Sequence, residues 1–375
     1  WDKPEVVEAV TTQLTGLCYD TARIRVYSYD RHVLCELSSS RDAYSEAEDG
    51  QILYAYYDLN SNSETYDITS FLAIADCYRE QQGLLHLHPV IVARDASWSA
   101  QAYCLEQQER MWRAENIVKQ ACDLVPSVRG MTYCSTREQA GDYLTRCTNR
   151  FPANYHLDCP PPISVHRDFY YWLDLGFDPR RFKASVKARH YIQLWIDNTL
   201  PLPARRYLCV TLRESTLQPK RNSDVAEWNR FFLWLQAHHP DLSVVVIRDT
   251  EEVFSVSPFS AQNVFIFSPA SFHMHLRMAL YEMAYLNMGC SNGPKQLCHL
   301  SQSISYITNK MIVEDYQGSS SARFIDRNIE IGKNFRFADD NQIIDWRTDN
   351  YENLVDSFVR FESKFPIVQM DSMSG

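Results

Sequence analysis

The sequence is poor in glycine and has no long hydrophobic run. Only 11 of its 375 residues are glycine, and neither a P-loop nor a G-x-G-x-x-G fingerprint occurs. No stretch of about 18 consecutive apolar residues is present, so no transmembrane segment is predicted. The 11 cysteines form no C-x-x-C pair, which argues against a zinc site or a disulfide framework. A cytoplasmic location fits best, with peripheral attachment to a membrane as the alternative.

Positive charge is also scarce. The formal net charge is −10, and Lys and Arg gather only in short clusters such as 180–183 and 187–189. A broad nucleic-acid surface would need many clustered basic residues. We therefore predict no nucleic-acid partner, although a few local basic groups could still bind a small phosphate compound.

What is present is a repeated alternation of strand and helix patterns. Residues 51–59, 68–83 and 84–93 read as strand, helix and strand, which predicts parallel pairing with a right-handed crossover. The other predicted strands are 130–135, 207–215, 242–250, 263–268 and 304–313. The other predicted helices are 102–124, 136–148, 167–176, 179–198, 223–240 and 271–289, with an amphipathic helix in the C-terminal tail.

A proline-rich stretch divides the two alternating regions. Three consecutive prolines at 160–162 can continue neither a helix nor a central strand, and they suit a stiff connector. We predict an α/β fold with an N-terminal domain at 1–165, a hinge near 159–166 and a C-terminal domain at 166–375. Two such domains imply a cleft between them.

Polar residues follow the predicted strands of the C-terminal domain. Arg213 and Glu214 end one strand, and Arg248 and Asp249 end another. Because ligands of open α/β sheets bind at the carboxyl ends of the strands, these residues are expected in one crevice. The arginines would donate hydrogen bonds to phosphate, and an acid would bind ribose hydroxyls. The simpler alternative pairs each arginine with a neighbouring acid as a surface ion pair.

The turn Ser291-Asn292-Gly293-Pro294 has the composition of a helix start. Pro suits the first helical position, and Ser or Asn before it can cap free amides. Such a start attracts anions through its unpaired N–H groups. The pattern therefore predicts a phosphate-binding turn, with an ordinary strand–turn–helix junction as the alternative.

A family resemblance is carried by two segments. The stretch "YLNMGCSNGPKQLCHLSQSISYITNK" and the upstream "YLCVTLRES…KRNSDVAEWNRFFLWLQAHHPDLSVVVIRDT" resemble the ADP-heptose:lipopolysaccharide heptosyltransferases over roughly residues 205–313. Two features depart from that family: Ser291 replaces its acidic turn residue, and Arg248-Asp249 replaces a glycine pair. ADP-heptose itself is therefore not implied as the donor.

The resemblance implies a GT-B glycosyltransferase with two Rossmann-like domains. The nucleotide-sugar donor would bind the C-terminal domain, where Lys220, Arg221 and Trp228 fall in the comparable zone. The acceptor, a glycan or a lipid-linked compound of surface polysaccharide synthesis, would bind the N-terminal domain. The resemblance implies no metal, and we predict no cofactor apart from the nucleotide-sugar substrate.

Glycosyl transfer needs a base for the acceptor hydroxyl. Asp58, at the end of the strand 51–59, is the first candidate, and Asp95, just after the strand 84–93, is the second. Both follow from the same strand-end rule. The alternative for Asp58 is an ordinary turn-opening residue.

Two other functions fit the same plan. A nucleotide-sugar 2-epimerase or hydrolase would need acids and a histidine facing the sugar, and His166 with Asp168 is the convenient cluster. A non-catalytic nucleotide- or sugar-binding protein would explain the loss of the acidic turn residue and of the glycine pair.

Overall fold

A computed structural model describes residues 50–95, 105–162, 167–201 and 206–367, together with the backbone of an antiparallel strand pair, β1 (Arg23–Tyr27) and β2 (Val33–Ser38). The chain divides into two compact units. Unit 1 comprises residues 1–62, 78–100 and 127–162, and unit 2 comprises residues 63–77, 101–126 and 163–375. The segments 63–77 and 101–126, which precede the predicted boundary at 165, thus group with the C-terminal unit. Residues 163–166 of the predicted hinge lie outside the described ranges.

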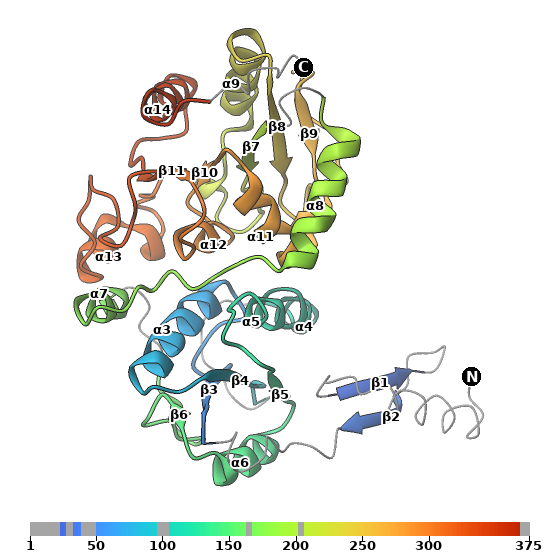
Figure 1. Ribbon diagram of the computed structural model, residues 1–375, viewed down its shortest axis with the longest axis vertical. Coiled ribbons are helices and arrows are strands. Elements are labelled where there is room, and N and C mark those ends of the chain that lie inside the picture. Colours follow the sequence, from blue (N-terminus) through green and yellow to red (C-terminus); the bar gives the residue numbers. More distant parts are fainter. Residues whose placement is uncertain are drawn as a thin grey trace, which may run out of the picture. The chain divides into compact units, whose positions relative to one another are not determined.

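Unit 1 is built on a parallel sheet with the strand order β5-β4-β3-β6 (Figure 1). All seven residues of β3 are buried, as expected for a central parallel strand covered on both faces. Tyr54, Tyr56 and Tyr155 form part of its core with Ala140 of α6. Its elements are β3 (Ile52–Asp58), β4 (His86–Val92), β5 (Thr132–Cys134), α6 (Arg137–Arg146) and β6 (Arg150–Phe151). The helix α3 (Asp67–Gln81) connects β3 to β4.

Unit 2 contains a six-stranded parallel sheet with the order β12-β11-β10-β7-β8-β9. Counted from β7 as the first strand, the order is 3-2-1-4-5-6, that of a doubly wound Rossmann sheet, with its switch point between β7 and β10. The predicted α/β class with two parallel sheets is therefore confirmed. The strands are β7 (Arg206–Thr211), β8 (Leu242–Ile247), β9 (Val264–Ile266), β10 (Leu286–Cys290), β11 (Tyr306–Asn309) and β12 (Gln342–Ile344).

The longer helices of unit 2 are α7 (Arg167–Asp174), α8 (Val186–Thr199), α9 (Val225–His238), α11 (Met274–Met283) and α14 (Tyr351–Lys364). Shorter ones are α4 (Gln107–Arg113), α5 (Gln120–Cys122), α10 (Pro269–Phe272), α12 (Lys295–His299) and α13 (Ser321–Asp326). A π-helical stretch, Ala114–Lys119, joins α4 to α5 within the predicted helix 102–124. Within the described ranges, none of the helices combines the length and apolar character that crossing a membrane requires.

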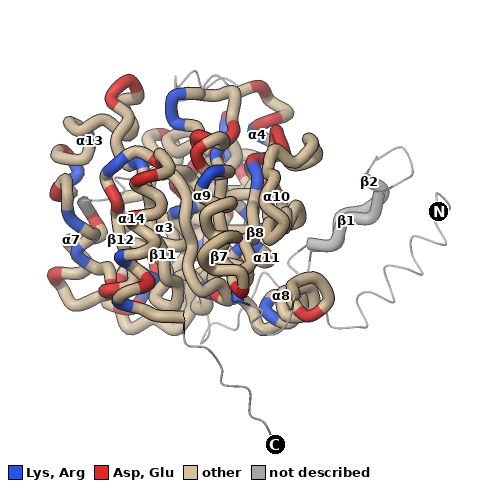
Figure 2. The backbone as a smooth tube through the Cα atoms, turned by 90° about the horizontal axis from the view of Figure 1, so that it is seen from above, with Lys and Arg blue, Asp and Glu red and all other residues tan. Residues whose placement is uncertain are grey.

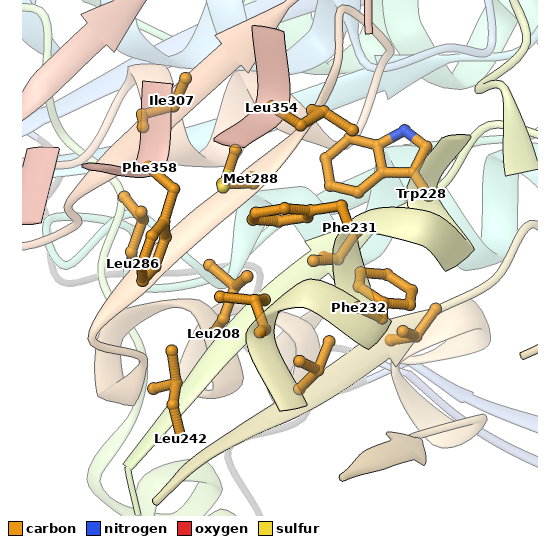
Figure 3. Packing of buried hydrophobic residues seen from close by; sticks show 14 of the residues in the cluster. Leu208, Trp228, Phe231, Phe232, Leu242, Leu286, Met288, Ile307, Leu354 and Phe358 are labelled. Carbon is orange, nitrogen blue, oxygen red and sulfur yellow. The ribbon is translucent and has the colours of Figure 1, made fainter. Parts of the chain in front are cut away.

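The main core of unit 2 lies between α9, α14 and the sheet (Figure 3). Trp228, Phe231, Phe232 and Leu235 recur at the i, i+3, i+4, i+7 spacing of one helix face, and all four are fully buried. They pack on Leu208, Val210, Val244, Val246, Met288, Leu354 and Phe358. This packing fixes the sheet and, with it, the loops at its carboxyl edge.

The prediction of a helix at 271–289 is wrong over its last six residues. The helix α11 ends at Met283, and the residues that follow form β10, which pairs with β7 on one side and β11 on the other. The sequence "AYLNMGC" carries no breaker before Gly289, so its local pattern continues the helix. Pairing on both edges decides the strand, because strand preference depends on tertiary neighbours.

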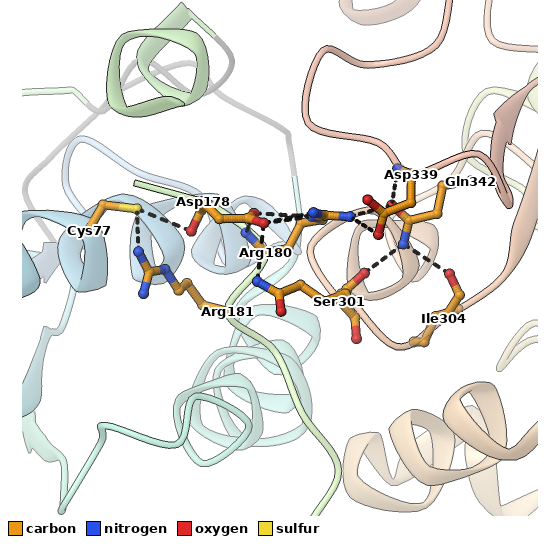
Figure 4. A network of polar contacts seen from close by, with 9 residues as sticks. Cys77, Asp178, Arg180, Arg181, Ser301, Ile304, Asp339 and Gln342 are labelled. Carbon is orange, nitrogen blue, oxygen red and sulfur yellow. Dashed lines mark hydrogen bonds and ion pairs between the residues drawn. The ribbon is translucent and has the colours of Figure 1, made fainter. Parts of the chain in front are cut away.

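The prediction of a helix over 179–198 is also wrong at its start. Arg180 instead forms ion pairs with Asp178 and Asp339 and donates to the side chain of Gln342 (Figure 4). These contacts hold the segment in a non-helical path until Ser185, whose side chain accepts from the amide of Ala188 and caps α8.

His88 on β4 makes the stability of unit 1 sensitive to acid. His88 is 6% exposed, and its Nε2 lies 2.9 Å from the Thr132 hydroxyl. Burial lowers the pKa of His88 to about 4. Between pH 6.5 and about 4 the unfolded chain binds a proton that the folded chain does not, so stability falls as the pH drops through this window.

Replacing His88 by glutamine should remove this acid sensitivity. We expect the wild-type protein to lose about 3 kcal/mol more than His88→Gln between pH 7 and 4, since one pKa unit is about 1.4 kcal/mol. Urea unfolding at several pH values measures the difference, with the exposed His190→Gln as the control. Parallel pH profiles for wild type and His88→Gln would contradict the expectation.

Candidate functional site

The switch point of unit 2 is held together by a close backbone approach. Gly289 of β10 pairs with Thr211, the last residue of β7. A Cβ at Gly289 would lie 2.5 Å from the Thr211 carbonyl oxygen, and its φ is 154°, so no other residue fits without strain. The loops that begin at Leu212 and Ser291 therefore leave the same edge of the sheet side by side.

Arg213 is buried at this edge and makes no ion pair with a described residue. Only 8% of it is exposed. Its guanidinium donates to the carbonyls of Leu217 and Gln218 and to the side-chain oxygen of Asn222. Burial lowers the pKa of Arg213, and the charge of Arg221 lowers it further. Neutral oxygens orient this cation, and no carboxylate of the described residues lies at ion-pair distance from it, which suits it to bind an anion.

Arg248, in contrast, is neutralised by Glu214. Its Nε lies 3.0 Å from Glu214 Oε2, and a second bond joins Nη2 to Oε1. Both side chains are nearly buried, and Glu252 lies 3.5 Å away. The hydrogen bond to Glu214 raises the pKa of Arg248. The ion-pair alternative thus describes Arg248, and the phosphate-binding prediction for it would require Glu214 to move.

Arg213 and Arg248 nevertheless line the same pocket. Its volume is about 370 Å³, and its walls are Arg213, Glu214, Asn222, Ser223, Val225, Arg248, Glu252 and Pro258. Figure 2 shows basic and acidic residues mixed along the described chain. Arg213 and Arg248 are both buried at this edge, with 8% and 4% exposed.

Asp249 and Arg221 are the chain neighbours of two residues that line the pocket, Arg248 and Asn222. Asp249 is half-buried, and its carboxylate accepts from the amides of Glu214 at 3.3 Å and Thr250 at 2.8 Å. The guanidinium of Arg221 lies 4.5 Å from the Tyr316 ring centroid, and its Nη2 lies 3.5 Å from the Ser291 carbonyl oxygen. Arg221 thus connects the loop after β7 to the turn after β10.

The turn 291–294 has the predicted cap. The side chain of Asn292 accepts from the amide of Lys295 at 3.0 Å, and Pro294 directly precedes α12. In the described part of the chain, the amides of Asn292 and Gly293 donate to no protein acceptor, whereas the amide of Ser291 donates to Asn309. Two backbone donors are therefore left at this turn.

The sequence interpretation missed Asp349, whose carboxylate contacts three side chains next to the site. Asp349 Oδ2 accepts from Trp228 Nε1 at 3.1 Å and from Cys290 Sγ at 3.0 Å. Lys310 lies 3.4 Å from Oδ1 and donates to the Asn222 carbonyl at 2.7 Å. Burial acts to raise the pKa of Asp349, but these hydrogen bonds and charges outweigh it and the pKa is lowered. Asp349 lies in the C-terminal tail, where no sequence pattern pointed to it.

In unit 1, Asp58 ends β3 as predicted, but its carboxylate is fully engaged. Both oxygens lie 2.8 Å from Arg137 Nη1. The Tyr155 hydroxyl donates to Oδ2 at 2.7 Å, and the Asn60 amide donates to Oδ1 at 2.9 Å. Only 1% of Asp58 is exposed. These contacts describe a structural ion pair.

Replacing Asp58 by alanine should destabilise unit 1 by about 3 kcal/mol, because it leaves Arg137 without its buried partner. Thermal and urea unfolding measure this change, and Asp158→Ala, at a carboxylate that is 91% exposed, is the matched control. A loss no larger than that of the control would show that the pair is dispensable.

The remaining candidates are Asp95 of unit 1 and the alternative pair His166 and Asp168 of unit 2. Asp95 follows β4 and is half-buried, and its amide donates to the Asn60 side chain at 2.8 Å. Of the alternative cluster, Asp168 is half-buried at the start of α7, and His166 lies outside the described residues. The described residues contain no group of three or more metal-ligating side chains.

No protein-family model and no curated protein matches the chain. Among solved structures, it is similar to the glycosyl transferase family 9 protein from Veillonella parvula DSM 2008 (TM-score 0.45, 11% identity, 69% of this chain and 80% of that one). It is also similar to E. coli ADP-heptose lps heptosyltransferase II, with a TM-score of 0.46 and 8% identity over 84% of this chain and 99% of that one. A third similar structure is that of a putative UDP-N-acetylglucosamine 2-epimerase from Listeria monocytogenes, with a TM-score of 0.37 and 8% identity over 84% of this chain and 88% of that one. The second is a heptosyltransferase, the family that the sequence resembles, but similarities this low carry no argument about function.

Proposed function

We propose that this protein is a glycosyltransferase that takes a sugar from a nucleotide-sugar donor bound at the carboxyl edge of the unit 2 sheet. One observation carries the proposal: the buried Arg213 guanidinium lies at the β7–β10 switch point without a carboxylate partner among the described residues. The switch point of a doubly wound sheet is where nucleotides bind. A pre-oriented cation there supplies what a leaving diphosphate needs.

The roles of the surrounding residues follow from their positions. Arg213 and Arg221 would offset the charge of the diphosphate, and the amides of Asn292 and Gly293 would donate to its oxygens. Asp249, at the end of the second strand, would accept from the ribose hydroxyls. Arg248 would hold Glu214 as the wall of the pocket, and it would contact phosphate only if that ion pair opened.

The reaction needs a base that removes the proton of the acceptor hydroxyl. The acceptor oxygen then bonds to the anomeric carbon, the bond from that carbon to the phosphate oxygen breaks, and the nucleoside diphosphate leaves. Asp95 now replaces Asp58 as the favoured base, because each oxygen of Asp58 already accepts from Arg137 and a second donor. Arginines and backbone amides would stabilise the leaving group, so we propose a metal-independent reaction.

The acceptor proposed is a glycan or lipid-linked compound of surface polysaccharide synthesis, reached in the cytoplasm or at the membrane surface. Calorimetry with a panel of nucleoside diphosphates tests the donor site, and turnover of the matching nucleotide sugars tests the reaction. Transfer to an acceptor is the expected result. Epimer or free sugar formed without an acceptor would favour the epimerase or hydrolase, and failure to bind any nucleotide would end the proposal.

A further inference from the structure

A second buried arginine lies near the switch point and is not used in the proposal above. Arg277, on α11, is 4% exposed, and no carboxylate of the described residues lies at ion-pair distance from it. Its Nε donates to the Ala270 carbonyl at 2.7 Å, and its Nη1 donates to the Tyr281 hydroxyl at 3.1 Å. The Nη2 group donates to no protein atom in the described part of the chain. Nε and Nη1 of this guanidinium are therefore held by protein acceptors, whereas Nη2 has no acceptor among the described residues.

Tyr281, the acceptor of the Arg277 Nη1 hydrogen bond, also contacts the switch point. The Tyr281 hydroxyl lies 2.7 Å from the hydroxyl of Thr211, the last residue of β7. The next side chain back along β7, Val210, packs instead in the core that contains α9. Since alternate side chains of a strand face opposite sides of the sheet, Arg277 approaches the end of β7 from the α11 face.

Tyr66 lies against the turn after β10. The Tyr66 ring lies directly against Gly293, where an added Cβ would be 2.6 Å from a ring carbon. Tyr66 also lies within electrostatic range of both Arg277 and Asp249. Arg277 and Asp249 of the β8 end therefore both lie within electrostatic range of the ring that contacts this turn.

A buried guanidinium with no carboxylate at ion-pair distance gains a directly bonded charged partner when an anion binds, and Asp249 acts on Arg277 only from electrostatic range. We infer that Arg277 binds the distal, sugar-bearing phosphate of the donor. The inference rests on the proposed function. A donor whose ribose lies at Asp249, after β8, and whose diphosphate crosses β7 brings its distal phosphate to the turn after β10, which the Tyr66 ring contacts and which lies on the side of Arg277.

Comparing a nucleoside diphosphate with its monophosphate tests this assignment, because only the diphosphate carries the distal phosphate. Arg277→Met should bind the diphosphate about 10- to 100-fold more weakly than wild type, the value of a charge-assisted hydrogen bond, and should bind the monophosphate within about twofold of wild type. Arg277→Lys keeps the charge but not the forked donor geometry, and it should show a smaller loss, again only for the diphosphate. Isothermal titration calorimetry measures the six affinities, those of the wild type and of both variants for each nucleotide, and thermal unfolding confirms that each variant is folded.

Equal weakening of binding for both nucleotides would show that Arg277 only stabilises α11. Unchanged affinity for both nucleotides would show that Arg277 does not reach the ligand. Either result overturns the inference while the proposed function stands. If Arg277→Met does not fold, Arg277→Lys decides by the same comparison. A wild-type protein that binds neither nucleotide ends the proposed function, and the inference with it.

Discussion

Replacing Arg213 by alanine should weaken nucleoside diphosphate binding by about 100-fold. The guanidinium is already desolvated and oriented by Leu217, Gln218 and Asn222, so the ligand meets a cation that needs little rearrangement. A forked pair of charge-assisted bonds to phosphate is worth about 3 kcal/mol, which corresponds to roughly two orders of magnitude in affinity. Calorimetry with the best nucleotide of the panel measures the loss.

Two further variants make this result specific. Arg230→Ala removes the same charge from an exposed position of α9 and should leave the affinity unchanged. Arg213→Met keeps the apolar stem of the side chain and should lose binding as Arg213→Ala does, provided that thermal unfolding shows a folded protein. Full affinity in a folded Arg213→Met protein would remove the observation on which the donor site rests.

Replacing Asp95 by asparagine should lower kcat by about 10³-fold without weakening donor binding. A general base contributes about 10²- to 10⁴-fold, and an asparagine of the same shape cannot take the acceptor proton. Rates measured with the nucleotide sugar and acceptor identified by turnover give kcat, and calorimetry gives donor affinity separately. Loss of kcat with an unchanged affinity would place Asp95 in the chemical step.

The matched control for that variant is Asp158→Asn, the same change at an exposed carboxylate of unit 1. Asp58→Asn separates the two candidate bases, because it should reduce stability rather than kcat of the folded enzyme. A folded Asp58→Asn protein that lost turnover, beside an active Asp95→Asn protein, would return the base to Asp58.

The two arginines that follow β7 and β8 show how a strand-end rule succeeds and where it stops. The sequence places both at the carboxyl edge, because a run of buried apolar residues followed by charged residues marks where a strand leaves the sheet. It does not reveal that Glu214 neutralises Arg248 whereas Arg213 is held by neutral oxygens. That distinction depends on the path of the loop 212–224, which folds back over Arg213.

The same limit applies to residues that no local pattern marks. Asp349 reaches the site from the C-terminal tail, Arg137 reaches Asp58 from the start of α6, and Arg277 lies inside a helix whose sequence looks like ordinary core. Asp349 and Arg137 act through partners that are tens of residues away in the sequence. Arg277 acts through hydrogen bonds to residues on and just before its own helix. Spacing within one element carries no information about such contacts.

By itself, the sequence determined that the chain alternates strands and helices, that the sheets are parallel, and that polar residues follow the strands of unit 2. These properties depend on local periodicity and on burial, which the order of apolar and polar residues records. Only the tertiary structure decided that residues 286–290 form a strand, that β7 and β10 are neighbours, and which arginine has no carboxylate at ion-pair distance among the described residues. Pairing on both edges of β10 and the close contact of Gly289 with Thr211 are long-range interactions, and they outweigh the helical preference of the segment.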